Sequence, residues 1–326
     1  MSAARYTARK LAEGALTIFV GITLAFFLFR LMPGDPTAAF LDIRLTPEAK
    51  MQLIRDFGLD RPLWEQYLLF LKNLARGNLG VSFAYRMPVS RLVFGPKLFN
   101  TIVLMGLGMI ISAALSTYLG MLAGWRRGSK LDRFLMGFSY AATSAPIFWI
   151  GLLLLMVFAG YLGVLPASGT SSAGMEGASF LARLLDYLWH LAGPLTVIVI
   201  YFMPSYLLYV RSSVINLLGE DFVVALKAKG ISEKLIMYKH LMRHALTTVV
   251  TLAALQSPLL VSGAIITETV FGWNGIGLLL YEAVLKADYP VVQAIFILTI
   301  AVVVIANMLA DIVNSYLDPR IRLGRR

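Results

Sequence analysis

The residues that could carry out chemistry in this chain are few, and their spacing fits none of the common catalytic or metal sites. His240 and His244 lie four residues apart and could share a metal ion, but no glutamate or third ligand stands at the spacing of a zinc motif. Cysteine is absent, which excludes thiol chemistry, disulfides and cysteine-based metal sites. The chain also has no GxxxxGK[ST] phosphate loop, and no Ser/His/Asp arrangement can be argued from spacing. We therefore expect no catalytic residue, no metal and no cofactor bound by this chain, and we interpret both histidines as part of a solvated basic helix face.

Composition indicates that these side chains belong to a membrane protein. Of 326 residues, 58% are hydrophobic and only 14% are charged, which is typical of a polytopic membrane protein and outside the range of soluble domains. The net charge of +11 is also compatible with nucleic-acid binding. Most basic residues, however, fall in loops between apolar runs, where they orient membrane spans. We expect an all-α polytopic fold, with the lipid bilayer and not nucleic acid as a partner.

Six apolar runs are long enough to cross a bilayer. They cover residues 11–32, 101–124, 134–162, 187–210, 249–270 and 291–312. Basic residues concentrate in the N-terminal segment, in loops 125–133 and 211–246, and in the tail 318–326, whereas loops 163–186 and 267–290 carry one each. The excess of positive charge predicts that both termini are cytoplasmic and that residues 1–32 comprise a cytoplasmic start and a retained first span. Residues 99–317 then form the membrane core.

The long outer loop, residues 33–98, is expected to fold as a helical cap. Thr46, Pro47 and Glu48 form a helix start that would run to Gly58. A second helix is expected from Pro62 to just before Gly77, with an apolar stripe that packs onto the spans. Prolines inside the expected spans, at positions 146, 194, 204 and 258, indicate either hinges in a pathway or ordinary kinks.

Charge inside the spans is sparse. Glu13 and Asp311 lie near the cytoplasmic ends, and Arg30 and Glu268 near the outer ends, so all four are expected to reach the membrane interface. The mid-span polar residues are neutral, and we interpret them mainly as interhelical hydrogen-bonding groups. They are Ser112, Ser116, Thr143, Ser144, Thr196, Gln256, Ser257, Ser262, Thr299 and Asn307. This pattern favours transport driven by energy from outside the chain. A self-sufficient ion-coupled carrier or channel is the rival, and a membrane enzyme lacks a catalytic constellation.

The most informative segment is a charged, amphipathic stretch, residues 220–246, between two apolar runs. Asp221 suits the first turn of a helix, Gly230 interrupts the helix, and Ser232 with Glu233 can begin the next one. Because a polar segment between two spans must lie in water, and this one is basic, it is expected in the cytoplasm. A short helix pair there would form a docking surface for a partner. The other interpretation is a basic loop held at lipid headgroups.

Several motifs in fixed order resemble a known family along nearly the whole chain. They are LMPGDP at 31–36, FGLDRPL at 57–63, the segment DFVVALKAKGIS at 221–232, ETVFGWNGIG at 268–277, DYPVVQ at 288–293 and LDPRIR at 317–322. Together they resemble the inner-membrane permease subunits of binding-protein-dependent ABC importers of the dipeptide, oligopeptide and nickel type. The segment at 221–232 resembles that family's coupling loop, although Val224 and Leu226 replace the Glu and Ala of the wider consensus, and Asn274 replaces a proline usual in this subfamily.

The resemblance implies one half of a heterodimeric pore in a bacterial or archaeal cytoplasmic membrane. Implied partners are a homologous second permease, two cytoplasmic ATPase subunits that use ATP and Mg, and an extracytoplasmic solute-binding protein. Short peptides are the implied cargo, with nickel chelates, glutathione and oligosaccharides as alternatives. It also implies site residues. Those at the ATPase contact are Asp221, Ala228, Lys229, Gly230 and Ser232, and those at the outer loop or gate are Glu268, Phe271 and Trp273.

Overall fold

The computed structural model describes residues 3–31, 61–256, 260 and 264–317, and in this part of the chain the secondary structure is helical apart from one isolated bridge between Val81 and Pro88. The longer elements are α1 (Ala3–Leu31), α3 (Leu63–Ala75), α5 (Pro96–Trp125), α6 (Lys130–Ser144), α7 (Ile147–Leu154), α8 (Phe180–Leu218), α11 (Met242–Gln256), α14 (Ile276–Leu285) and α15 (Tyr289–Leu317). The shorter ones are α4 (Val89–Val93), α9 (Asp221–Ala228), α10 (Glu233–Leu235) and α13 (Ile265–Val270), the π-helical turns η2 (Leu155–Tyr161) and η4 (Ile236–Leu241), and the 3-10 turn η3 (Met175–Gly177). The all-α fold class is confirmed.

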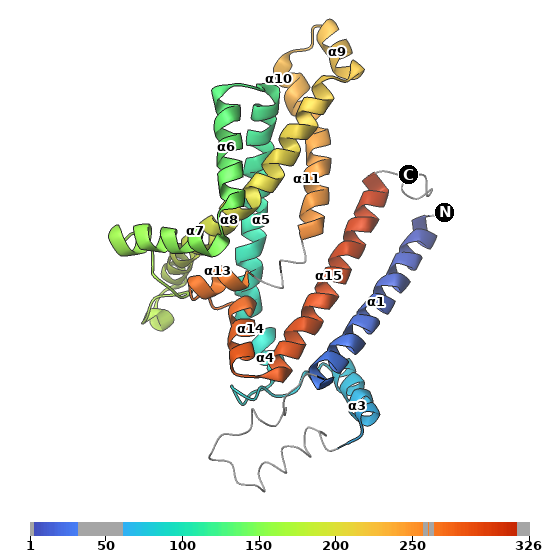
Figure 1. Cartoon of the computed structure of the whole chain (residues 1–326), viewed down its shortest axis with the longest axis vertical. Helices are drawn as coiled ribbons and strands as arrows, with labels where there is room; N and C mark the ends of the chain where they lie inside the picture. The colour runs from blue at the N-terminus through green and yellow to red at the C-terminus, as the bar shows by residue number, and fades with distance from the viewer. Residues whose placement is uncertain (1–2, 32–60, 257–259, 261–263, 318–326) are drawn as a thin grey trace.

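Helices α5 and α8 run side by side through the centre of the molecule (Figure 1). They approach closely because small residues of α5 face α8. A Cβ atom on Gly120 would lie 3.0 Å from Val210 Cβ, and one on Gly124 would lie 2.8 Å from Val214 Cβ. Small residues permit such close backbone approach between membrane helices. The pair therefore forms a tightly packed centre around which the other helices are arranged.

Hydrogen bonds across the same interface account for two of the neutral polar residues. The Ser112 and Ser116 hydroxyls of α5 donate to the carbonyl oxygens of Val199 and Met203 in α8, at 3.3 and 2.8 Å. The hydroxyls of Thr143, Ser144, Thr196 and Thr299 bond instead to carbonyls of their own helices. The interhelical interpretation therefore holds for the two serines but not for these four residues. Ser257 and Ser262 lie outside the described residues.

The third expected span, residues 134–162, is not a straight helix. It is divided into α6 and the α7–η2 segment, which are bent by 104° at a short break that contains Pro146. Pro146 cannot donate a helical backbone hydrogen bond, and it forces the preceding residue out of the helical conformation. Pro194 and Pro204, in contrast, lie inside the continuous helix α8. Pro258 lies outside the described residues.

The expected number of six spans is not established by the described residues. Among the described residues, four helices are long and apolar enough to cross a membrane, and the bent pair of α6 and α7–η2 brings the number to five at most. The expected fifth span, residues 249–270, is also not one described helix, because α11 ends at Gln256 and α13 begins at Ile265. Residues 257–259 and 261–263 of that stretch are outside the description. The count of six is therefore not confirmed.

Helices α1 and α15 form a second packed pair, and α3 crosses one end of it (Figure 1). The second cap helix, expected after Pro62, is confirmed as α3, and the left-handed Gly77 follows it with a φ of +73°. Its apolar stripe packs onto α1, with the Tyr67 and Phe70 rings 5.3 and 5.2 Å from the ring of Phe26. The first cap helix, residues 46–58, and the tail 318–326 lie outside the described residues.

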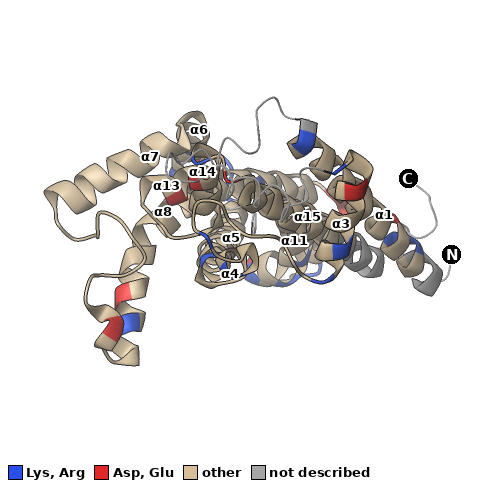
Figure 2. Cartoon of the chain, turned by 90° about the horizontal axis from the view of Figure 1, so that it is seen from below, with Lys and Arg blue, Asp and Glu red and all other residues tan. Residues whose placement is uncertain are grey.

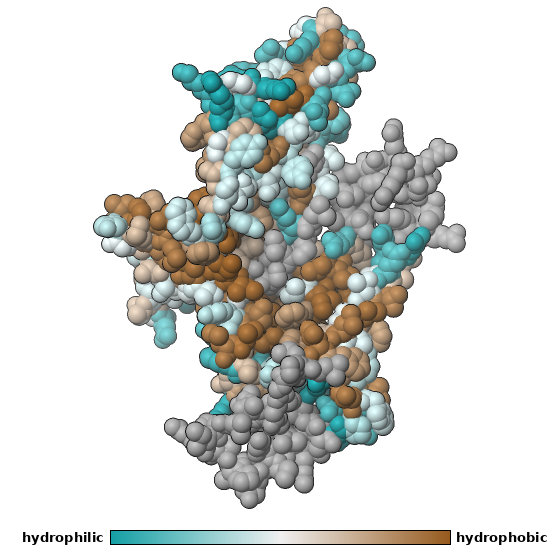
Figure 3. All heavy atoms as spheres, in the orientation of Figure 1, coloured by the Kyte–Doolittle hydropathy of each residue, from teal (hydrophilic) through white to brown (hydrophobic). Residues whose placement is uncertain are grey.

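The distribution of polarity follows this arrangement. Hydrophobic residues form a broad band across the middle of the molecule, while hydrophilic residues gather at the end that carries α9 and α10 (Figure 3). Seen from the opposite end, most of the ribbon is uncharged (Figure 2). Helix α1 begins, and α15 ends, toward the side of the molecule on which α9 lies (Figure 1).

Candidate functional site

The polar stretch at 220–246 folds as a protruding helix hairpin at one end of the molecule (Figure 1). It comprises α9, a turn, α10 and η4, and it joins α8 to α11. Val223 and Ile236 are fully buried and belong to the same hydrophobic cluster as Val210 and Val214 of α8. Two apolar residues therefore anchor an otherwise exposed hairpin to the central helix pair.

The turn at Gly230 has the geometry of a Schellman motif. Gly230 has a φ of +71°, its N–H donates to the Lys227 carbonyl at 2.9 Å, and the Ile231 N–H donates to the Leu226 carbonyl at 3.2 Å. Leu226 and Ile231, the positions that are commonly apolar in such a turn, both pack against the hydrophobic cluster. Glycine suits this position because the left-handed conformation is unfavourable for residues with a Cβ atom.

The five residues expected at the ATPase contact all lie on this hairpin and are all exposed. Asp221 begins α9, Ala228 ends it, Lys229 and Gly230 form the turn, and Ser232 precedes α10. Ser232 stands at the N-cap position with extended backbone, but its side chain makes no capping hydrogen bond, contrary to the expected role. All five residues are therefore accessible on the hairpin, and their contact with an ATPase stays a prediction.

Ring contacts tie α9 to its neighbours. The Lys227 ammonium lies 5.4 Å from the ring centroid of Trp125 at the end of α5, a cation–π distance. The rings of Phe222 and His244 lie 6.0 Å apart and connect α9 with the start of α11. His244 therefore belongs to the packing of the hairpin. Among the described residues, no group of three or more His, Asp or Glu side chains could hold a metal ion.

A partly buried ion pair beside the hairpin was not predicted from the sequence, because both members have the appearance of ordinary loop charges. The Arg211 guanidinium donates from Nε to Asp132 Oδ1 at 2.5 Å and from Nη2 to Asp132 Oδ2 at 2.9 Å. Asp132 is buried, and Oδ2 also accepts the Gly128 N–H at 2.8 Å. The contact clamps the α5–α6 loop onto the end of α8 that leads into the hairpin. The available signal was the Ser129-x-x-Asp132 pattern, in which Ser129 Oγ caps α6 by accepting the Asp132 N–H.

At the other end of α5, Glu268 forms a second buried carboxylate site. The expectation that Glu268 reaches the interface is wrong, because its exposed fraction is 0%. Oε1 accepts the Thr101 hydroxyl at 2.8 Å, and Oε2 accepts the Leu278 N–H at 3.0 Å. A Cβ atom on Gly275 or Gly277 would lie only 2.4 or 2.9 Å from Oε2. The two glycines of the motif therefore let the backbone close around this carboxylate.

Phe271 and Trp273, the other outer-loop candidates, are also buried. Phe271 packs with Leu154 and Val197, while Trp273 donates from Nε1 to the Asn100 carbonyl at 3.1 Å. The Trp273 ring lies 5.3 Å from that of Tyr187 in α8. These side chains join α13 and the following turn to α5, α7 and α8. They point inward, so their side chains present no surface to a partner.

A third buried carboxylate, Asp288, anchors the junction of α14 and α15. The Asp288 side chain accepts a hydrogen bond from the Ser82 hydroxyl at 2.5 Å. It also accepts the backbone N–H groups of Phe83 and Ala84, both at 3.1 Å. Close by, the Tyr85 hydroxyl donates to the Glu282 carboxylate. Burial, together with that carboxylate, raises the pKa of Tyr85. Asp288, the first residue of the DYPVVQ motif, therefore holds residues 82–84 against the junction of α14 and α15.

Comparison with protein families gives two adjacent matches. The family described as binding-protein-dependent transport system inner membrane component matches residues 116–323. The family described as the N-terminal part of a binding-protein-dependent transport system membrane component matches residues 3–95.

Several curated proteins are similar over nearly their whole length. An oligopeptide transport system permease protein of Bacillus subtilis is 33% identical over 309 residues, covering 94% of this chain and 96% of that protein. A dipeptide transport system permease protein of Escherichia coli is 34% identical over 322 residues, covering 93% and 95%. A di/tripeptide transport system permease protein of Pseudomonas aeruginosa is 35% identical over 336 residues, covering 98% and 99%.

Proposed function

The chain belongs to the family of inner membrane components of binding-protein-dependent transport systems, and from this premise we propose that it forms half of the translocation pathway of an ATP-driven importer of short peptides. The peptide cargo is supported by three relatives whose names specify oligopeptides, dipeptides or di/tripeptides and which align with more than nine-tenths of the chain. The chain itself performs no covalent chemistry and binds no cofactor. Partner subunits bind and hydrolyse ATP with Mg.

The observation that carries the proposal is the exposed hairpin at 220–246. It projects from the end of the central α5–α8 pair, it is anchored by buried apolar residues, and its turn is fixed by backbone hydrogen bonds. Such a surface can receive a push from an ATPase subunit and transmit it to α8 and α11. Asp221, Ala228, Lys229, Gly230 and Ser232 form the contact in this proposal.

The remaining partners are a homologous second permease, a second ATPase and an extracytoplasmic solute-binding protein. The hairpin and both termini are cytoplasmic in this arrangement. Support comes from the basic loops and from the start of α1 and the end of α15, which lie toward the side that carries the hairpin (Figure 1). Glu268, Phe271 and Trp273 then act near the outer end by holding α13 and α14 against α5 and α8, rather than by touching cargo.

The test is reconstitution. The tagged chain is purified from membranes of the cells that naturally produce it, and its co-purifying subunits are identified. Uptake of a labelled dipeptide into proteoliposomes is then measured with and without ATP, and with a proton or sodium gradient. Stable recovery of ATPase subunits and uptake only with ATP support the proposal. Gradient-driven uptake by the chain alone would instead establish a self-sufficient carrier.

A further inference from the structure

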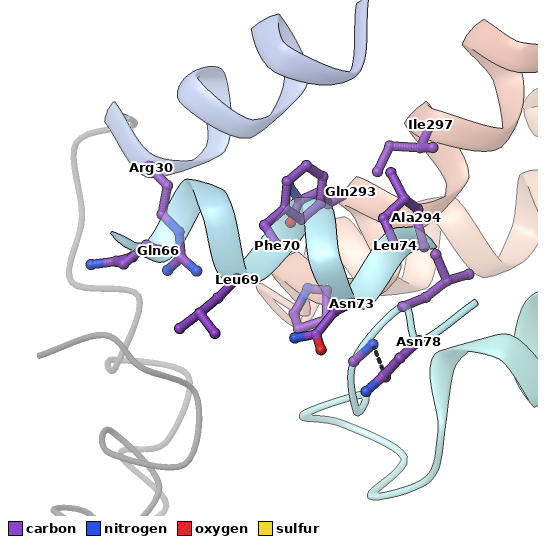
Figure 4. Close-up of a pocket in the computed structure, with 13 residues that line it drawn as sticks. Arg30, Gln66, Leu69, Phe70, Asn73, Leu74, Asn78, Gln293, Ala294 and Ile297 are labelled. Carbon is purple, nitrogen blue, oxygen red and sulfur yellow. Dashed lines mark hydrogen bonds between the residues drawn. The ribbon is translucent and has the colours of Figure 1, made fainter. Parts of the chain in front are cut away.

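A cavity of about 130 Å³ lies where α3 crosses the ends of α1 and α15 (Figure 4). It has room for roughly four water molecules, enough for a small polar group. Its described polar lining is one guanidinium and several carboxamides, from Arg30, Gln66, Asn73, Asn78 and Gln293. No carboxylate belongs to the described lining.

Arg30 dominates the charge of this cavity. It is half-buried at the end of α1, and its guanidinium carbon lies 5.6 Å from the ring centroid of Phe26. Among the described side chains, no carboxylate lies within ion-pair distance of it, whereas Arg9 and Arg211 each have an acidic partner. In Figure 4 the Arg30 side chain points toward α3, and Gln293 faces the cavity from α15. A half-buried guanidinium of this kind favours an anion as its partner.

The surroundings place the cavity at a membrane interface. The apolar stretch of α1 ends at Arg30, and that of α15 begins at Tyr289, so both helices leave the membrane at this level. Leu28 on α1 and Trp64 and Leu68 on α3 are exposed by 56%, 63% and 55%. Exposed tryptophan beside aliphatic side chains is typical of the headgroup region. A ligand in the cavity would therefore have hydrocarbon on one side and water on the other.

We propose that this cavity binds the phosphodiester of an anionic glycerophospholipid, with Arg30 as the cationic partner and the acyl chains along the exposed apolar side of α1. The carboxamides of Asn73, Asn78 and Gln293 supply N–H donors for the phosphate and the headgroup hydroxyls. The Asn78 side-chain oxygen already accepts the Gly80 N–H at 3.0 Å, which leaves its N–H groups available to the cavity. The ammonium group of an ethanolamine headgroup would bring a second positive charge close to the Arg30 guanidinium, whereas a glycerol headgroup carries no charge. The site therefore favours phosphatidylglycerol over phosphatidylethanolamine.

The test measures lipids bound to the full-length chain, purified with whatever subunits accompany it and analysed by native mass spectrometry after delipidation and titration with phosphatidylglycerol. Arg30→Gln is expected to reduce bound phosphatidylglycerol at least fivefold. Gln293→Glu, which nearly preserves side-chain shape but adds a carboxylate beside Arg30, is expected to do the same. Lys72→Gln is the matched control, because Lys72 is an exposed cation on α3 outside the cavity. It is expected to bind as the wild type does.

Three competitors separate the possible ligands. Phosphatidylethanolamine and inorganic phosphate are expected to displace phosphatidylglycerol poorly, whereas cardiolipin is expected to displace it well. Equal lipid binding by wild type, Arg30→Gln and Gln293→Glu would overturn the proposal. Displacement by millimolar inorganic phosphate alone would also overturn it, because the site would then serve a soluble anion. Because the readout is lipid binding, its failure would leave the transport proposal intact.

Discussion

Replacing Gly230 tests whether the hairpin is a coupling site through the geometry of its turn. Gly230 has a φ of +71°, and a Cβ atom built there would meet no atom within 4 Å. A substitution therefore introduces backbone strain without a steric clash inside the chain. We expect Gly230→Asn to be mild, Gly230→Ala intermediate and Gly230→Val most severe, because asparagine tolerates the left-handed conformation and β-branched residues do not.

The free-energy cost of substituting Gly230 can be estimated from the conformation and hydrogen bonds of the turn. The left-handed conformation costs about 1–2 kcal/mol for a residue with a Cβ atom. If the chain escapes this strain by opening the turn, it loses the two backbone hydrogen bonds of Gly230 and Ile231, each worth about 1 kcal/mol. A penalty of about 1–2 kcal/mol lowers the population of the native turn relative to other forms by a factor of about 5–30. ATPase binding should weaken by no more than that factor, unless the new side chain itself obstructs the contact.

The assay pairs two quantities, ATPase subunit recovered per permease and peptide taken up per ATP hydrolysed. Gly219→Ala is the matched control, since Gly219 lies in the same exposed segment with an ordinary φ of −86° and room for a Cβ atom. Membrane insertion should be normal in every variant, because the turn is exposed and outside the spans. Wild-type values for Gly230→Val in both measurements would refute the coupling role. An equal loss of ATPase recovery or of uptake per ATP in the Asn, Ala and Val variants would refute the backbone argument, because backbone strain predicts that the loss increases in that order.

Three further predictions concern the other sites. Asp132→Asn should lower the free energy of unfolding by about 2–3 kcal/mol, because it removes the negative charge from a bidentate ion pair with Arg211. A double-mutant cycle with Arg211→Gln, measured by thermal shift, should give a coupling energy above about 1 kcal/mol. Glu268→Ala should lower the thermal midpoint more than Glu268→Gln does, since alanine leaves two buried donors unpaired at about 1–3 kcal/mol each; equal loss would mean that the charge itself is required. The chain has no cysteine of its own, so single cysteines can report topology. A cysteine introduced at Lys72 should react with an impermeant thiol reagent in intact cells, whereas one introduced at Lys234 should not. Labelling of position 234 from outside would contradict the proposed topology.

The sequence was sufficient for elements whose determinants are local. The long apolar runs predicted α1, α5, α8 and α15, and Pro62 with Gly77 bracketed α3. Composition is similar on both sides of Pro146, however, so hydropathy alone could not distinguish a kinked span from the 104° bend observed. The same limit applies to residues 249–270, where an apolar run spans α11 and α13 without revealing that they are separate helices. Hydropathy measures transfer into an apolar environment, and it carries no information on helix direction.

The candidate site residues likewise divide into those that the sequence alone could place and those that depend on distant partners. Gly230 could be placed from its neighbours, because a helix ending in a left-handed glycine is determined by hydrogen bonds within six residues. Glu268 could not, because its partner Thr101 is 167 residues away in sequence. Asp132 and Arg211 are 79 residues apart, and each has the appearance of an ordinary loop charge until the helices are packed. A buried carboxylate is recognised only from the donors that surround it.

The two candidate regions lie at opposite ends of one mechanical unit. Helix α8 is continuous over 39 residues, which at about 1.5 Å per residue spans about 58 Å, and α5 packs against it too closely to slide independently. At the hairpin end, the Asp132–Arg211 pair fastens the α5–α6 loop to α8. At the other end, Thr101 and Tyr187 bring Glu268 and Trp273 against the starts of the same two helices. A displacement of the hairpin should therefore reach α13 and α14 as a rigid-body movement of the α5–α8 pair. On this argument, loosening the pair at either end should uncouple ATP hydrolysis from uptake while leaving ATPase binding intact, whereas Gly230→Val is expected to weaken ATPase binding.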